Sequence, residues 1–338
     1  MRVPHPRRRS TAATTGLAAA ALLVGARVFR WRRHHRGPAE VRELRRAELG
    51  ENPTGAGLSV VVNIGAGSAG DIVELLEDRL PDSEIVVLDD PSELPNALEA
   101  AATGEIRVLG VAGGDGSINT AAGIAAEHGL PLLALPGGTL NHLARDLGIT
   151  SVEDAAAALA AGTAVEVDLP TIDGRPFLNT ASFGSYAELV DAREALEDRI
   201  GKWPALAVAG WRVLRKGSPI VVELDGRERS LWMVFIGNCR YEPDGFAPSR
   251  RLRLDDGQLD IRVIDAGHPW CRTRLVAGLI TGRLGRSPVY DQWTATSLTV
   301  RSVDGSLRLA CDGETFDGDQ DVEVVKTGRR IALYSTAS

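Results

Sequence analysis

The stretch from Ala112 to Arg145 decides the fold, because it holds two glycine-rich runs, Gly113-Gly114-Asp115-Gly116-Ser117 and Pro136-Gly137-Gly138-Thr139-Leu140-Asn141. Each run follows a short apolar segment, 107–111 and 130–135, with the length and composition of a buried strand. We therefore expect two strand-to-helix turns side by side at one edge of a sheet.

Turns of this kind suit a nucleotide phosphate. Glycines let backbone N–H groups approach a polyphosphate, and the helix that follows directs its partly positive end toward the anion. The carboxylate of Asp115 cannot bind phosphate itself, so we expect it to hold Mg²⁺ or to accept a proton from the attacking group. Thr139 and Asn141 offer a hydroxyl and an amide for phosphate or ribose oxygens, although both could equally cap the next helix. The combination predicts phosphoryl transfer.

Composition and charge narrow the class of partner. The chain has 338 residues, 44% of them hydrophobic and 25% charged, which is ordinary for a folded protein of about two domains. Residues 1–36 contain nine Arg and no acidic residue, so subtracting them from the net charge of −7 leaves −16 for the rest. A body this acidic argues against nucleic acid as a partner, and the basic end favours anionic lipid.

The amino-terminal segment has an uncharged run, residues 10–26, between arginine-rich flanks. As a helix it would reach about 26 Å, slightly less than a typical hydrocarbon core of about 30 Å. We expect an uncleaved anchor that keeps the protein on the cytoplasmic side of the membrane; a cleaved signal peptide and a basic tail are the alternatives. Cys239, Cys271 and Cys311 lie far apart in the sequence and are expected to be core thiols in a reducing compartment.

The order of predicted elements changes along the chain. Strands and helices alternate after Leu58, which indicates a parallel sheet with helices on both faces, and strands separated by tight turns dominate after Val165, which indicates antiparallel pairing. Hairpins are predicted around Asp225-Gly226 and Asp304-Gly305. We expect the following organisation: a basic tail at 1–36, a linker at 37–57, an α/β nucleotide-binding domain at 58–164, a β-rich substrate domain at 165–320, and a hairpin of 321–325 with 330–334 that could return to the first domain.

Helices are also predicted inside the β-rich part, over 186–199, 204–215 and 269–283. The segment 269–283 contains both apolar residues, Trp270 and two leucines, and three arginines. It could lie on a membrane surface or pack on the sheet.

Two further motifs need interpretation. Gly65-x-Gly67-x-x-Gly70 precedes a helix, and Asp89 follows 24 residues after Gly65, as in a dinucleotide-binding fold, so an NAD(P)-dependent oxidoreductase is an alternative. A phosphate-binding site built from three glycine-rich turns explains this loop as well as the turns at 113–117 and 136–141. Asp312-Gly313-Glu314 could be a surface turn, but phosphorylation of an alcohol needs a carboxylate facing the nucleotide across a cleft.

With these residues in place, the chain resembles the diacylglycerol kinase catalytic-domain family, which includes sphingosine kinases and bacterial lipid kinases. The resemblance runs from about Leu58 to Tyr334, and its most specific parts are 113–117 and 138–144. Asn63 to Gly67 looks like the family's first loop, and Asp312 to Glu314 looks like its carboxy-terminal acidic motif. Thr120 and His142 depart from the family, which carries acidic residues at these positions.

The resemblance implies an ATP-dependent kinase for a lipid hydroxyl, with a β-sandwich as its second domain. It implies that Asp115 is a Mg²⁺-binding or catalytic carboxylate and that Glu314 is the general base. It also implies a structural Mg²⁺ near Arg253, Asp256 and Gln258, with Asp256 the only side-chain carboxylate among them.

We therefore expect a lipid kinase that uses ATP and Mg²⁺ on a diacylglycerol-like or sphingoid lipid at a membrane surface. An NAD kinase, which shares the Gly-Gly-Asp-Gly turn, is the closer alternative, and a homodimer is left open. The expected nucleotide-binding residues come from all three turns: Asn63, Gly67, Ser68, Gly113, Gly114, Gly116, Ser117, Gly137, Gly138, Thr139 and Asn141.

Overall fold

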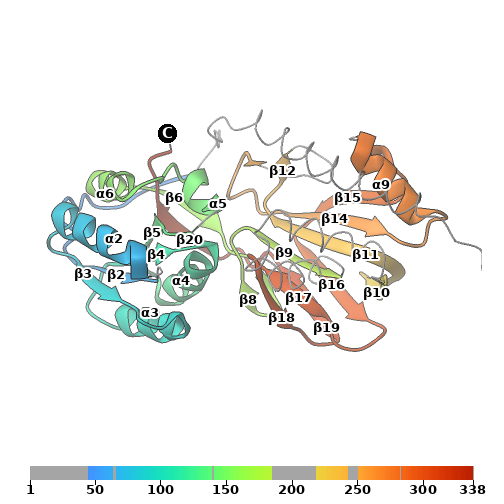
Figure 1. Cartoon of the computed structure of the whole chain (residues 1–338), viewed down its shortest axis with the longest axis horizontal. Helices are drawn as coiled ribbons and strands as arrows, with labels where there is room; N and C mark the ends of the chain where they lie inside the picture. The colour runs from blue at the N-terminus through green and yellow to red at the C-terminus, as the bar shows by residue number, and fades with distance from the viewer. Residues whose placement is uncertain are drawn as a thin grey trace, which may run out of the picture.

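The computed structural model describes residues 45–63, 66–138, 141–184, 218–242, 250–281 and 283–337, without the side chains of 66–69, 142, 279 and 280. These residues form two lobes, each built around its own sheet and its own apolar core (Figure 1). The fold class agrees with the expectation: an α/β domain with a largely parallel sheet and a second, mainly antiparallel domain.

The first sheet has seven strands in the order β1-β6-β20-β5-β4-β2-β3. The neighbours β3, β2, β4, β5 and β20 are parallel, whereas β6 and β1 are antiparallel to their neighbours. The central strands are buried along almost their whole length, as expected for a sheet covered on both faces. The strands are β1 (Arg46–Glu48), β2 (Leu58–Val62), β3 (Glu84–Val87), β4 (Val108–Gly113), β5 (Leu132–Pro136), β6 (Thr163–Asp168) and β20 (Arg330–Tyr334).

Five α-helices cover this sheet in the described part of the chain: α2 (Ala66–Arg79), α3 (Leu94–Ala102), α4 (Asp115–His128), α5 (His142–Asp146) and α6 (Val152–Ala161). A 3₁₀ turn, η1 (Pro91–Glu93), precedes α3. Ser151 caps α6 in a capping box with Asp154, which fixes the start of this helix. Gly129 and Gly162 end α4 and α6 in the left-handed conformation that glycine adopts without strain.

The second sheet has eleven strands, all paired antiparallel, along the path β18-β17-β9-β11-β10-β16-β19-β7-β8 with β14 and β15 beside β11. Side chains from strands along the whole path share one core, as in a sandwich. The strands are β7 (Thr171–Ile172), β8 (Arg175–Pro176), β9 (Thr180–Gly184), β10 (Ile220–Leu224), β11 (Arg227–Asn238), β14 (Leu259–Asp265), β15 (Tyr290–Ala295), β16 (Ser297–Ser302), β17 (Arg308–Cys311), β18 (Glu314–Asp317) and β19 (Asp321–Val325).

Three smaller elements complete this domain. Strands β12 (Tyr241–Glu242) and β13 (Arg250–Arg251) form a separate pair. Helix α9 (Cys271–Thr281), with the 3₁₀ turn η2 (Leu284–Arg286) after it, packs on the sheet through Leu275 against Trp232 and Ile264. One face of the segment 269–283 therefore packs on the sheet, as one of the two expectations has it.

Two expected hairpins are wrong. Strands β16 and β17 flank Asp304-Gly305 but do not pair, because β16 lies between β10 and β19 while β17 lies between β9 and β18. Strands β19 and β20 do not pair either, because β19 belongs to the second sheet and β20 to the first. The hairpin around Asp225-Gly226, between β10 and β11, is confirmed.

The expected boundaries also shift. The segment expected as a linker, 37–57, contains β1, which pairs with β6 at the edge of the first sheet. The buried Asn52 organises the next turn, where its side chain accepts the Gly55 N–H and donates to the Ala56 carbonyl. Strand β6 crosses the expected boundary at 164/165.

The expected anchor at 10–26 and the helices expected at 186–199 and 204–215 lie outside the described residues. Among the helices that the structure describes, none is long and apolar enough to span a membrane.

Candidate active site

The turns after β2, β4 and β5 meet at the carboxyl-end edge of the first sheet. Gly113 at the end of β4 is in register with Pro136 at the end of β5, and the Gly137 N–H donates to the Gly113 carbonyl at 2.8 Å. Asn63, directly after β2, donates its backbone N–H to the Ala112 carbonyl at 2.8 Å. Parallel strands end at the same edge, so three turns far apart in the sequence become neighbours there. We call residues 63, 113–117, 136–138 and 141 the loop cluster.

Glycine is required at two positions of the loop cluster because of close approach. A Cβ on Gly138 would lie 2.6 Å from the backbone Cα of Gly114, and a Cβ on Gly113 would lie 2.6 Å from the side-chain Cβ of Ser117. Real Cβ atoms do not make contacts this short with backbone, so the two turns can touch only without side chains.

Two asparagines stabilise these turns. The Asn63 side chain donates to Ser117 Oγ at 3.0 Å, which ties the first turn to the start of α4. Asn141 adopts a left-handed conformation at φ 47°. It does not cap α5 with its side chain, but accepts the Gly138 N–H at 2.9 Å and donates to the Gly138 carbonyl at 2.7 Å. Asn141 therefore occupies the N-cap position of α5, as one expectation has it, but without a capping hydrogen bond from its side chain.

Asp115 is the first residue of α4, where an acidic side chain is favoured by the helix dipole. Its side chain is half-buried. Its Oδ1 atom lies 3.5 Å from the Leu143 backbone nitrogen, a long contact that holds the carboxylate only weakly. Asp115 therefore presents oxygens beside the N-terminal turn of α4.

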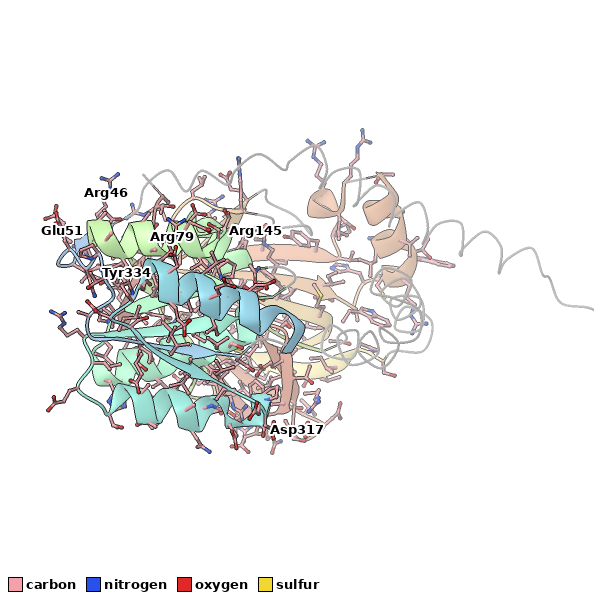
Figure 2. The ribbon with its side chains drawn as sticks, turned by 60° about the vertical axis from the view of Figure 1, so that its left-hand side comes forward. Arg46, Glu51, Arg79, Arg145, Asp317 and Tyr334 are labelled. Carbon is pink, nitrogen blue, oxygen red and sulfur yellow. The ribbon has the colours of Figure 1, made fainter. Side chains whose placement is uncertain are left out.

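Glu314 belongs to the other domain, as the first residue of β18, yet it reaches the loop cluster. Its Oε1 atom lies 2.6 Å from the point that a Cβ on Gly116 would occupy. Asn119, one turn later on α4, donates to the Pro176 carbonyl of the second domain at 3.0 Å. Strand β18, which also carries Asp317, borders the first domain in both views (Figures 1 and 2). The two domains therefore bring both expected catalytic carboxylates to the first turn of α4.

A partly buried anchor fixes the position of Glu314. Asp312, two residues before it, has a left-handed backbone and accepts the backbone N–H groups of Leu178, Asn179 and Thr180 at 2.7–2.9 Å. Burial raises the pKa of Asp312 to about 6, although these three hydrogen bonds favour its charged form. The alternative that Asp312-Gly313-Glu314 is only a surface turn is therefore wrong.

Arg251 connects this anchor to the first domain. Its side chain is 1% exposed and donates to the Leu178 carbonyl at 2.6 Å and to Asn179 Oδ1 at 3.0 Å. The same guanidinium pairs with Asp146 Oδ2 at 2.7 Å, on the helix α5 that follows the third turn. Arg251 and Asp146 thus link the loop cluster to the segment that holds Asp312. No local spacing in the sequence signals this link, because the two residues are 105 positions apart.

The expected structural metal loop lies elsewhere, between β13 and β14. The guanidinium of Arg253 pairs with Asp255 at 3.1 Å. Asp256 accepts the Arg240 and Gln258 N–H groups, both at 2.8 Å, and the Gln258 carbonyl accepts the Cys239 N–H at 3.0 Å. This loop does not share residues with the loop cluster.

Some expected residues stay as predictions. Thr139 lies outside the described residues, and the side chain of Ser68 is not described. Gly67 lies in the first turn of α2, directly after the Asn63 turn.

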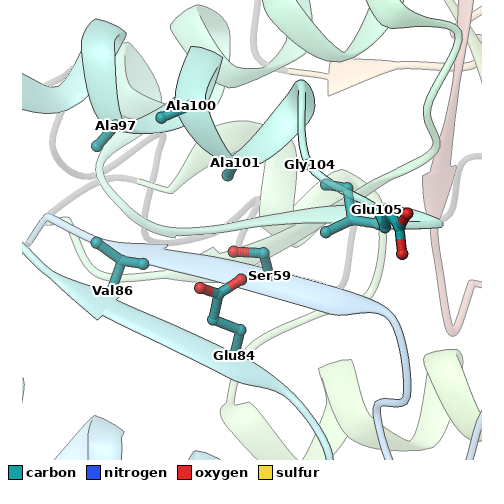
Figure 3. A pocket seen from close by; sticks show the side chains of 9 residues that line it. Ser59, Glu84, Val86, Ala97, Ala100, Ala101, Gly104 and Glu105 are labelled. Carbon is teal, nitrogen blue, oxygen red and sulfur yellow. The ribbon is translucent and has the colours of Figure 1, made fainter.

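A cavity of about 480 Å³ lies between α3 and the edge formed by β2 and β3 (Figure 3). Ser59, Glu84 and Glu105 line it with alanines of α3. These residues sit near the amino ends of the strands, so the cavity is separate from the loop cluster.

Comparison with known proteins identifies the family. Residues 58–172 match the family model described as "Diacylglycerol kinase catalytic domain". The chain is similar to the diacylglycerol kinase of Bacillus subtilis, with 32% identity over 250 residues that cover 70% of this chain and 80% of the relative. The chain belongs to the diacylglycerol kinase family.

Other relatives agree with this family. A Pseudomonas fluorescens protein named "Probable lipid kinase YegS-like" is 29% identical over 228 residues, which cover 65% of this chain and 75% of that protein. Crystallography has given the structure of a diacylglycerol kinase from Bacillus anthracis, which has the same fold with a TM-score of 0.56 and 19% identity, covering 82% of this chain and 96% of that one. The family is one of lipid kinases, which are phosphotransferases, and the comparisons favour neither the oxidoreductase nor the NAD kinase.

Proposed function

We propose that this member of the diacylglycerol kinase family transfers the γ-phosphate of ATP to the hydroxyl of a membrane lipid that is diacylglycerol-like or sphingoid. The observation that carries the proposal is the position of Glu314, which reaches from the second domain to Gly116 in the first turn of α4. A carboxylate from one lobe, placed against a phosphate-binding turn of the other, is the arrangement that an alcohol acceptor needs.

The loop cluster would bind the nucleotide phosphates. The turns meet at the N-terminal end of α4, a helix of 14 residues, and such a helix end offers backbone N–H groups and a partly positive dipole to an anion. Asn63 and Asn141 hold the turns through the contacts described above. Because these groups are already in position, they stabilise charge on the phosphate without rearrangement.

Glu314 would accept the proton of the lipid hydroxyl as that oxygen attacks the γ-phosphorus. The bond from phosphorus to the bridging oxygen of ADP breaks, and the proton stays on the Glu314 carboxyl until it leaves to solvent. Asp312 and Arg251 keep this carboxylate in place across the domain boundary.

Asp115 fits a Mg²⁺ ion that accompanies ATP. Its carboxylate oxygens are hard ligands beside the phosphate-binding turn. The hydrogen bond that the described residues make to this carboxylate is a long one, 3.5 Å from the Leu143 backbone nitrogen to Asp115 Oδ1. When bound, Mg²⁺ supplies charge neutralisation on the transferring phosphoryl group.

The lipid must come from a membrane surface, and α9 offers a contact for one. Trp270, directly before α9, is 79% exposed, and the exposed Arg274 follows one helical turn later. Arg272, between them, places its guanidinium over the Trp232 ring at 4.8 Å. An exposed tryptophan with arginines is a combination that binds the headgroup region of anionic membranes. The expected location on the cytoplasmic side stays part of this proposal.

The test is to incubate the purified chain with γ-labelled ATP, Mg²⁺ and a mixed lipid extract. We expect label in a lipid product with the wild-type chain and none with Asp115→Ala, whose fold is checked by its melting temperature. Label only in NADP⁺ on addition of NAD⁺, or normal turnover by Asp115→Ala, would reject the proposal.

A further inference from the structure

Where the chain passes between the two domains, a lysine and an aspartate are buried together. Asp168 ends β6 in the first sheet, and Lys326 follows β19 in the second. Their side chains are only 5% and 4% exposed, and Lys326 Nζ lies 3.0 Å from Asp168 Oδ2. Two ions that have left water at this depth must be matched by close partners.

The lysine has three acceptors around it. Besides Asp168, its ammonium donates to Asn238 Oδ1 and lies 3.3 Å from Cys239 Sγ. An ammonium has three N–H donors, so these three contacts use all of them. Asp168 also accepts the Arg330 Nε–H at 3.0 Å and the Gly257 N–H at 2.8 Å.

The same surroundings resemble a cation site. Asp168, Cys239 and Asp256 each place one ligand atom within 4.8 Å of the others. Asp256 belongs to the loop for which the family resemblance implies a structural Mg²⁺. However, the ammonium of Lys326 already lies against Asp168 and Cys239, and a thiol is not a ligand that Mg²⁺ prefers. A divalent ion placed at Asp168 and Cys239 would meet a second cation at contact distance, which a buried site disfavours strongly.

We propose that Lys326 supplies the cation of this junction, so that the Arg253 to Gln258 loop folds without a structural divalent ion. The junction therefore does not fit a divalent ion at Asp168 and Cys239. Asp256, the one side-chain carboxylate that the resemblance assigns to its Mg²⁺, already accepts a backbone N–H on each of its two oxygens. The loop is held instead by the Gly257 N–H on Asp168 and by the two backbone N–H groups on Asp256. The inference does not depend on the proposed function. If it holds, any Mg²⁺ dependence of activity reports on the nucleotide site alone.

The first test uses the wild-type full chain without nucleotide. After dialysis, its content of Mg, Ca, Mn and Zn is measured by mass spectrometry, and its melting temperature is measured with EDTA and with each divalent ion. We expect no stoichiometric metal and the same melting temperature in EDTA and in Mg²⁺. A bound divalent ion, or a lower melting temperature in EDTA, would overturn the proposal without any variant.

The second test removes the charge. Lys326→Met keeps the length of the side chain and leaves Asp168 without its buried ammonium, so we expect the melting temperature to fall by roughly 5–15 °C. Arg330→Met is the matched control, because it removes the other cation on Asp168 from a side chain that is 34% exposed, and a smaller fall is expected.

A third variant, Lys326→Ala, opens space at the junction. We expect its melting temperature to rise when Mg²⁺ or Ca²⁺ is added, unlike that of the wild-type chain. A Lys326→Met protein as stable as the wild type would overturn the proposal, because the junction would then need no internal cation.

Discussion

Glu314 Oε1 lies 2.6 Å from the point where Gly116 would carry a Cβ, although the two residues belong to different domains and are separated by almost two hundred positions. Gly116 stands in the first turn of α4, next to Asp115. The absence of a side chain at this position is what allows the second domain to bring a carboxylate to the loop cluster. The distance between Glu314 and the loop cluster therefore depends on how closely the two domains approach each other.

Gly116→Ala should separate stability from activity. Alanine stabilises a helix relative to glycine by roughly 0.5–1 kcal/mol, so the melting temperature should not fall by much. The added methyl group displaces the Glu314 carboxylate, and we expect kcat to drop by roughly 10- to 100-fold. Gly70→Ala, in α2 with nothing within 4 Å of its Cβ position, is the control. Wild-type turnover by Gly116→Ala would show that Glu314 works from another position.

Glu314→Gln should remove the proton acceptor while keeping the shape of the side chain. We expect turnover to fall by roughly 10²- to 10⁴-fold while ATP affinity, measured by calorimetry, stays unchanged. Asp317→Asn, on the same strand and 79% exposed, should be neutral. An equal loss of affinity and rate would assign Glu314 to nucleotide binding instead.

Arg251→Met should weaken both the fold and the reaction. It leaves Asp146 and Asn179 without their buried partner, at a cost of about 3–5 kcal/mol in the free energy of unfolding. Urea unfolding of Arg251→Met, Asp146→Asn and the double variant measures the coupling between the two side chains. Additive effects would contradict a direct link between α5 and the Asp312 anchor.

Activity should fall when the pH is lowered through about 6, because Asp312 then takes up a proton. Its pKa is raised to about 6 by burial, and the protonated carboxyl cannot accept all three backbone N–H groups that fix Glu314. In Asp312→Asn, kcat measured between about pH 5 and pH 8 should be lower and should lack this inflection. An inflection that persists in Asp312→Asn would belong to another group.

The same titration affects stability in the opposite direction. A carboxyl whose pKa is higher in the folded state than in the unfolded state contributes stability below about pH 4, and this contribution is lost as the pH rises through about 6. Asp312 thus lowers stability in the pH range where its charge is useful to the reaction.

Trp270→Ala should weaken binding to anionic vesicles several-fold, measured by co-sedimentation, because an exposed indole is lost from the surface beside α9. Val303→Ala, 55% exposed in the same domain, is the control. Turnover on a detergent-solubilised lipid should stay unchanged in both variants. Equal vesicle binding by Trp270→Ala and the wild type would exclude α9 as a docking element.

The sequence predicts the loop cluster well because each turn has a local signature. Gly113 to Ser117 and Pro136 to Asn141 follow apolar strands, and parallel strands bring their carboxyl ends together whatever the distance between them in the chain. Of the three cysteines expected to be core thiols, Cys239 and Cys311 are buried, whereas Cys271, the first residue of α9, is only half-buried. All three are free thiols.

The pairing of later strands could not be predicted in the same way. Asp304-Gly305 is a good turn signal, but β17 pairs with β9, more than a hundred residues earlier, rather than with β16. Turn chemistry describes only the next few residues, whereas the neighbour of a strand depends on the whole core. The same reason explains why Arg251, Asp146 and Lys326 are not predicted from the sequence. Buried ion pairs between distant segments have no characteristic spacing in the sequence.

Strand β20, residues Arg330–Tyr334, sits in the middle of the first sheet between β5 and β6. During synthesis, everything from 171 to 325 must leave the ribosome before this gap can be filled. The amino-terminal lobe therefore remains an open, incomplete layer until residues 330–334 have been made, and a chain that stops before residue 330 lacks a central strand. The second domain must therefore be synthesised before the sheet of the first domain can be completed.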